Sequence, residues 1–220
     1  MIRGFLMSDL TQTQVEQAVA GYQDRYLESD YVTAKAIKAI AIDDASVKLD
    51  IEVGYPALGV RAEIEQALGE LLKAVAGTRA VTVNVTWNIA ANEAQKDVEN
   101  LTTVKNIIAV ASGKGGVGKS TTSVNLALAL AAEGASVGIL DADIYGPSQA
   151  IMLGIKEGQR PEVKGEQFWM PIAAHGLQSM SMGYLVDENT AMVWRGPMAC
   201  RALQQIIHPT LWPALEYRGV

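Results

Sequence analysis

Strict alternation of apolar and polar residues is the clearest pattern at the start of this chain. Residues 47–53 carry apolar side chains on one face and charged side chains on the other. This period of two predicts a half-buried β-strand. Residues 34–42 form a second apolar-rich segment, and the turn-forming run 43–46 separates the two, which predicts a hairpin. The apolar face of the second strand is formed by Val47, Leu49, Ile51 and Val53.

Apolar residues recur at helical spacing on both sides of this hairpin. Residues 11–27 predict an amphipathic helix with Thr11 or Thr13 as its N-cap, and residues 60–76 predict a second helix. Residues 80–87 alternate again, so the predicted order is α-β-β-α-β. The residues expected to face inward are Val15, Ala18, Val19, Tyr22 and Tyr26 in the first helix and Ile64, Leu68, Leu71, Leu72 and Val75 in the second.

A polar, acidic stretch over residues 91–103 interrupts the apolar periodicity. Such a composition suits a solvated connection between two domains. We therefore expect a small N-terminal α+β domain over residues 1–92, a linker over 93–104 and a second domain over 105–220.

The second domain begins with a different pattern. Residues 107–111 form a short apolar run typical of a buried strand, residues 123–132 are rich in alanine and leucine, and residues 136–141 form another apolar run. Gly134 lies between the last two of these segments and predicts the end of the helix. A strand, helix and strand in this order predict a right-handed βαβ unit and an α/β fold with a parallel sheet. Ligands of such sheets bind at the carboxyl ends of the strands.

A glycine-rich phosphate loop lies between the first strand and the helix of this unit. The run satisfies the G-x-x-x-x-G-K-[ST] pattern, whose backbone N–H groups wrap phosphates. In that pattern Lys119 reaches the β and γ oxygens and Ser120 binds Mg²⁺. The residues expected to bind nucleotide are Gly113, Lys114, Gly115, Gly116, Val117, Gly118, Lys119, Ser120 and Thr121.

Three further residues are candidates for phosphoryl-transfer chemistry, which needs charge neutralisation and positioning. Lys114 could reach the γ-phosphate of a partner subunit as an arginine finger does, or it could be a solvated loop lysine. Asp141 and Asp143 follow a predicted strand and are expected to point in different directions. We assign Asp143 to orienting the attacking water and Asp141 to the Mg²⁺ shell, with an Asx turn as the alternative. The catalytic candidates are therefore Lys114, Lys119 and Asp143.

Composition narrows the function classes. The chain has 220 residues, 49% of them hydrophobic and 19% charged, with a net charge of −6. This acidic balance disfavours nucleic acid as a partner. No apolar run approaches the length needed to cross a bilayer, so we expect a cytoplasmic protein without membrane association. Cys200 is the single cysteine of the sequence, and a buried apolar role suits it better than metal ligation.

These motifs together resemble the Mrp/ApbC family of iron–sulfur cluster carrier ATPases. The loop at 113–121, the Asp-Ala-Asp-Ile-Tyr-Gly-Pro-Ser run at 141–148 and the Val-Trp-Arg-Gly-Pro-Met run at 193–198 carry the resemblance. The early lysine is shared with the MinD and ParA class of deviant phosphate-loop ATPases. Residues 11–90 resemble the domain that many bacterial members carry in front, although Tyr55 stands where that domain often has cysteine.

The resemblance implies an activity, and the chain departs from the family pattern at one point. It implies ATP and Mg²⁺ as cofactors, a [4Fe–4S] cluster bound between the subunits of a homodimer, apoproteins as cluster recipients, and slow ATP hydrolysis. After Tyr217 the family continues into further βα units and a C-x-x-C pair, which this chain lacks. We therefore expect a truncated ATPase domain with no iron–sulfur ligands in this chain, doubtful hydrolysis and one unpaired side of the 107–111 strand.

Three functions remain open from the sequence. The first is an iron–sulfur cluster carrier with ATPase activity. The second is a positioning or partitioning ATPase like MinD or ParA, which a basic membrane-binding or DNA-binding face would support. The third is a non-enzymatic fragment that binds nucleotide weakly.

Overall fold

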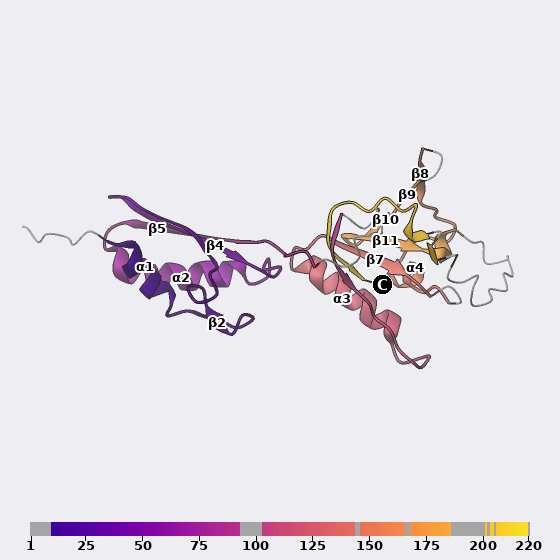
Figure 1. The fold of residues 1–220 in the computed structure, drawn as a ribbon, viewed down its shortest axis with the longest axis horizontal. Coiled ribbons are helices and arrows are strands. Elements are labelled where there is room, and N and C mark those ends of the chain that lie inside the picture. Colours follow the sequence, from indigo (N-terminus) through magenta and orange to yellow (C-terminus); the bar gives the residue numbers. More distant parts are fainter. Residues whose placement is uncertain are drawn as a thin grey trace, which may run out of the picture. The chain divides into compact units, whose positions relative to one another are not determined.

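The computed structural model describes residues 10–92, 103–143, 146–165, 168–185, 201, 203–204 and 206–219. The chain divides into two compact units, Met1–Ile89 and Ala90–Val220 (Figure 1). Within the described residues, none of the helices has both the length and the apolarity to cross a bilayer.

The first unit is a three-stranded sheet covered by two helices. β3 (Ile37–Ile42) pairs antiparallel with β4 (Ser46–Val53), as the hairpin prediction required, and β4 pairs parallel with β5 (Ala80–Trp87). α1 (Gln12–Val19) and α2 (Arg61–Ala76) lie along one side of this sheet (Figure 1). The alternating residues of β4 are buried, which confirms the predicted apolar face: Val47, Leu49, Ile51 and Val53.

The first helix begins as predicted but ends early. Thr11 is its N-cap and forms a capping box with Gln14, whose side chain accepts from the Thr11 N–H. The helix ends at Val19 rather than continuing to residue 27, and the chain enters a short hairpin of β1 (Gln23–Asp24) and β2 (Ser29–Asp30). The prediction was wrong here because tertiary contacts of the following residues outweigh their helical spacing.

Asp24 supplies those contacts. Its carboxylate is 2% exposed and accepts hydrogen bonds from the hydroxyls of Tyr31, at 2.6 Å, and Tyr55, and from the backbone N–H groups of Tyr26 and Leu27. Burial raises the pKa of Asp24, but these four hydrogen bonds outweigh it and leave the pKa below its ordinary value. A buried carboxylate with four donors holds the 23–30 hairpin against the 54–56 loop.

Two smaller predictions for the first unit were also wrong. β3 starts at Ile37 instead of residue 34, after Lys35 adopts a φ of 54° that strands do not allow. In α2, Val75 is 39% exposed, and Ala76 is buried instead. Ile64, Leu68 and Leu72 are buried as predicted.

The second unit is built on a five-stranded sheet in the order β10-β11-β7-β12-β6. The four strands from β11 to β6 are parallel, which confirms the α/β prediction, and β10 is antiparallel at the edge. The predicted βαβ unit is β6, α3 and β7, but β12 lies between its two strands. β6 therefore forms the other edge of the sheet. The bounds are β6 Val104–Ile108, α3 Lys119–Ala132, β7 Val137–Asp141, β10 Ile172–Ala174, β11 Leu177–Ser181 and β12 Leu215–Gly219.

Element bounds at the phosphate loop differ from the sequence prediction. β6 starts at Val104 and ends at Ile108, whereas residues 107–111 were predicted. The helix α3 begins at Lys119, four residues before the predicted start, so the end of the glycine-rich motif is its first turn. The remaining described elements are α4 Gln149–Met152, β8 Glu162–Lys164, β9 Phe168–Met170 and the 3₁₀ helix η2 Met182–Tyr184.

The face of β7 and β12 opposite α3 contains an unusual buried charge. The absence of a side chain at Gly138 allows Leu215 and Trp212 to pack directly on β7, because a Cβ there would come within 2.6 Å of Leu215 and 2.9 Å of Trp212. Arg218, paired in register with Gly138, is 3% exposed, and its guanidinium carbon lies 5.5 Å from the centre of the Trp212 ring. The Nε and Nη1 atoms of Arg218 and the indole Nε1 of Trp212 have no hydrogen-bond partner among the described residues.

Candidate functional site: a phosphate loop at the end of a parallel strand

The glycine-rich loop joins β6 to α3, as the sequence predicted. Gly116 has a φ of 74° and Gly118, the N-cap of α3, has a φ of 88°. A Cβ at either position would meet no atom within 4 Å, so glycine is needed for its backbone freedom rather than for space. The N-cap makes no side-chain hydrogen bond to the helix. The first turn of α3 therefore presents backbone N–H groups and the positive end of the helix dipole to an anion.

Lys119 and Asp143 are the two predicted residues that the fold brings together. The Nζ of Lys119 lies 3.5 Å from Oδ2 of Asp143, and both side chains are about one-third exposed, at 33% and 37%. The other carboxylate oxygen of Asp143 accepts from the N–H of Gly146 at 3.2 Å. A partly exposed ion pair of this length is weak, so an incoming phosphate can replace the carboxylate as the partner of Lys119.

Asp141 has a different environment from Asp143. It is 6% exposed, its Oδ1 accepts from the N–H of Asp143 at 3.0 Å, and its Oδ2 accepts from the N–H groups of Ser148 at 2.9 Å and Gln149 at 3.1 Å. The carboxylate therefore ties the end of β7 to the start of α4. These contacts include the Asx turn that the sequence left open as the alternative. A role in the Mg²⁺ shell stays a prediction.

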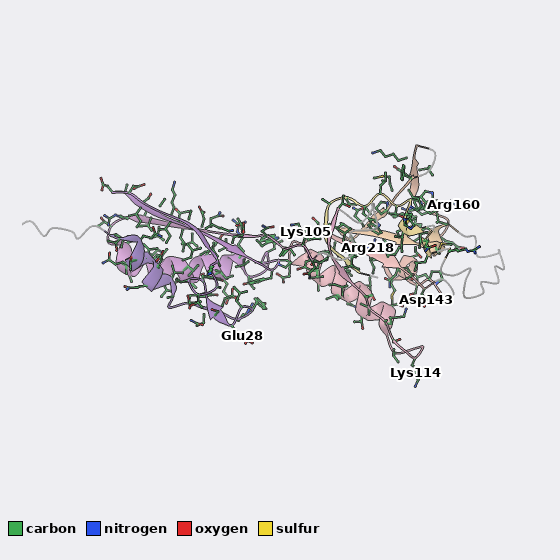
Figure 2. The ribbon with its side chains drawn as sticks, in the orientation of Figure 1. Glu28, Lys105, Lys114, Asp143, Arg160 and Arg218 are labelled. Carbon is green, nitrogen blue, oxygen red and sulfur yellow. The ribbon has the colours of Figure 1, made fainter. Side chains whose placement is uncertain are left out.

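Lys114 lies apart from the other candidates. Its backbone carbonyl accepts from the hydroxyl of Ser112 at 2.8 Å. Figure 2 shows the Lys114 side chain at the tip of the loop, pointing outward and away from Asp143. The structure thus does not bring Lys114 to the Lys119–Asp143 pair of its own chain.

Gln149 is a site residue that sequence reasoning missed. It is 4% exposed, and its Nε2 donates to the carbonyl of Ser120 at 3.4 Å, which places the amide beside the first turn of α3. Its Oε1 has no hydrogen-bond partner among the described residues, nor has the buried Oγ of Ser148. The only available signal was its position after the Gly-Pro-Ser run, and no known motif gives that position a role.

The oxygen atoms at this end of the sheet are of the kind that could hold a magnesium ion. The Ser120 side chain in the first turn of α3, the buried Asp141 carboxylate and the unpaired Gln149 oxygen are the hard ligands that Mg²⁺ prefers. In the described part of the chain, no three His, Cys, Asp or Glu residues form a metal-binding group.

Other candidates cannot be placed. Cys200 and the 193–198 run lie outside the described residues, as does most of the predicted 93–104 linker.

Tyr55, which stands in place of the cysteine often found in the front domain, donates its hydroxyl to Asp24.

Comparison with known proteins gives matches over both units. A family model described as NUBPL iron-transfer P-loop NTPase matches residues 103–218, and one described as iron–sulfur cluster assembly protein matches residues 12–85. Both matches agree with the sequence resemblance.

Individual relatives extend this result. The iron–sulfur cluster carrier protein of Escherichia coli K12 is 47% identical over 207 residues, which cover 94% of this chain and 56% of the relative. That of Pseudomonas fragi is 57% identical over 141 residues, covering 64% and 49%. A solved nucleotide-binding protein from Archaeoglobus fulgidus in complex with ADP is 32% identical, with a TM-score of 0.46, over 55% of this chain and 45% of that one. The chain spans about half the length of the curated relatives it matches.

Proposed function

The chain belongs to the iron-transfer P-loop NTPase family, and from this we propose that it binds and hydrolyses ATP with Mg²⁺ in the service of iron–sulfur cluster transfer to apoproteins. The observation that carries the proposal is the glycine-rich loop at the start of α3 with Lys119 beside Asp143. A cytoplasmic location and a homodimeric assembly are parts of the same proposal.

The phosphates of ATP occupy the first turn of α3 in this proposal. The N–H groups after Gly118 and the ammonium of Lys119 bind the β and γ oxygens, which places negative charge at the helix N-terminus where it is most stable. Phosphate binding releases Asp143 from Lys119. The freed carboxylate is then available to orient a water for in-line attack on the γ-phosphorus.

The metal contributes charge neutralisation on the β and γ oxygens when bound. Ser120 would hold it through its hydroxyl, and Asp141 would support it from the buried end of β7, where it also binds the N–H groups at the start of α4. Lys114, which points away from its own site, supplies the second cation to the nucleotide of a partner subunit. This step requires a dimer in which the two loops face each other.

The cluster is the cargo in this proposal, and [4Fe–4S] is the type that the family resemblance favours. Iron–sulfur clusters are held by cysteine thiolates, and the 220 residues contain one cysteine. A C-x-x-C pair therefore cannot come from these residues. The nucleotide site is complete in its phosphate loop without them, so ATP binding can be tested on this chain directly.

The test is a titration of residues 1–220 with fluorescent ATP in the presence of Mg²⁺, together with thermal melts with and without nucleotide. Saturable binding and a raised melting temperature are expected, because a ligand of the native state must stabilise it. Absence of both would refute the proposed nucleotide binding. Iron and sulfide analysis after anaerobic reconstitution should find no cluster on residues 1–220, because their single cysteine cannot supply the C-x-x-C pair. The cargo is tested by the same analysis in a longer chain that carries this pair, with cluster bound by a dimer as the supporting result.

A further inference from the structure

The amide of Gln149 lies between two elements of the nucleotide site. Its backbone N–H is bound to Asp141, and its Nε2 is 3.4 Å from the carbonyl of Ser120. The residue is therefore held at its backbone by Asp141 and at its side-chain nitrogen by Ser120, and Oε1 is its one side-chain polar atom without a partner in the described part of the chain.

The orientation of this amide follows from its surroundings. With the amide reversed, Oε1 would face the Ser120 carbonyl oxygen, and two acceptors would be in contact. The nitrogen therefore belongs at Ser120, and the oxygen is the free end. Buried polar atoms in native proteins are almost always paired, so a free acceptor at 4% exposure calls for a donor that arrives with a ligand.

The chemistry of the expected ligand identifies that donor. Triphosphate oxygens are acceptors and would repel Oε1, so the phosphates bound at the first turn of α3 do not satisfy it. Hydrated Mg²⁺ offers water O–H groups, and Mg²⁺ usually keeps several waters when it binds to proteins and phosphates. Ser120 is the predicted magnesium ligand, and its backbone carbonyl is the group that Gln149 already contacts.

We propose that Gln149 is a positioning residue for the magnesium ion, with Oε1 accepting a hydrogen bond from a water of the ion's hydration shell. This inference rests on the proposed nucleotide function. Through the bond between its backbone N–H and Asp141, Gln149 couples the hydrated ion to the end of β7, so metal binding and the contact between β7 and α4 depend on each other.

The test measures the magnesium dependence of nucleotide binding in the full chain. Labelled ATP is titrated into the unaltered protein and into Gln149→Leu and Gln149→Glu, with Mg²⁺ varied and with EDTA. For Gln149→Leu we expect the half-saturating Mg²⁺ concentration to rise about 10- to 100-fold, the usual effect of removing an outer-shell partner. Affinity in EDTA stays within about twofold, because the ion is absent there. Gln149→Glu keeps an acceptor oxygen and is expected to show a smaller rise.

The same titration provides a control variant and the results that would contradict the proposal. Gln66→Leu, which removes an exposed glutamine paired with Glu70 in the first unit, should leave the magnesium dependence unchanged. An unchanged half-saturation in Gln149→Leu, or an equal loss of affinity with Mg²⁺ and with EDTA, would overturn the positioning role and indicate a purely structural one. If the unaltered protein binds no nucleotide at all, the proposed function fails, and this inference fails with it.

Discussion

Replacing the buried arginine of β12 by leucine should make the second unit more stable. Burial lowers the pKa of Arg218 from 12.5 to about 10, a fall of about 2.5 pKa units. At about 1.36 kcal/mol per unit this corresponds to about 3 kcal/mol by which the fold disfavours the charged guanidinium. The cation–π contact with Trp212 offsets about 0.5–2 kcal/mol of that cost. The net gain expected for Arg218→Leu is therefore about 1–3 kcal/mol.

Urea denaturation followed by tryptophan fluorescence measures this gain. Three of the four tryptophans belong to the second unit and only Trp87 to the first, so the signal reports mainly on the second unit. The midpoint should rise without a change in slope, which identifies a change in stability rather than in compactness. The melting temperature should rise by about 2–12 °C, at about 2–4 °C per kcal/mol for a chain of this size.

A matched control separates burial from charge. Arg201→Leu removes an exposed arginine of the same unit and should change the midpoint little. If Arg218→Leu lowers the midpoint, the guanidinium has partners that outweigh its burial, and the reasoning is wrong. If both variants raise the midpoint equally, net charge rather than desolvation is responsible.

Four further outcomes are expected. Lys119→Ala should abolish saturable binding of labelled ATP, because the ammonium that meets the phosphates is lost. Lys114→Ala should leave that binding intact and abolish phosphate release in a hydrolysis assay; unimpaired hydrolysis would exclude the partner-site cation. Gly118→Ala places a side chain at a φ of 88°, which costs about 1–2 kcal/mol and should weaken nucleotide affinity in the same titration. Because the pKa of Asp24 is lowered on folding, its contribution to stability is present above about pH 4 and is lost below, so acid melts of Asp24→Asn should show a flatter pH dependence than the parent.

Local patterns predicted most of the secondary structure. The alternation at residues 47–53 and 80–87 and the periodicity of residues 60–76 correspond to β4, β5 and α2 within one residue at each end. These patterns succeed because the period of the side chains and the buried face belong to one element. The helix prediction failed for residues 20–27, because the buried Asp24 accepts hydrogen bonds from Tyr31, which follows this segment, and from Tyr55, which is 31 residues away.

The phosphate loop itself was determined by the sequence. Its glycines set the left-handed φ values, and its lysine and serine follow at the first turn of the helix, so the chemistry is encoded within nine consecutive residues. The placement of Lys119 beside Asp143 is less local, although the rule for parallel sheets anticipates it, since both residues follow carboxyl ends of strands.

Only the tertiary structure decided how the remaining residues are used. The pairing of β12 between β6 and β7 buries Arg218, and the contact between the start of α4 and Asp141 brings the Gln149 amide to Ser120. Neither result has a signature in the sequence, because each depends on which distant segments pack together. Spacing and residue type specify backbone conformation and local chemistry, whereas burial and the partners of polar atoms are properties of the assembled core.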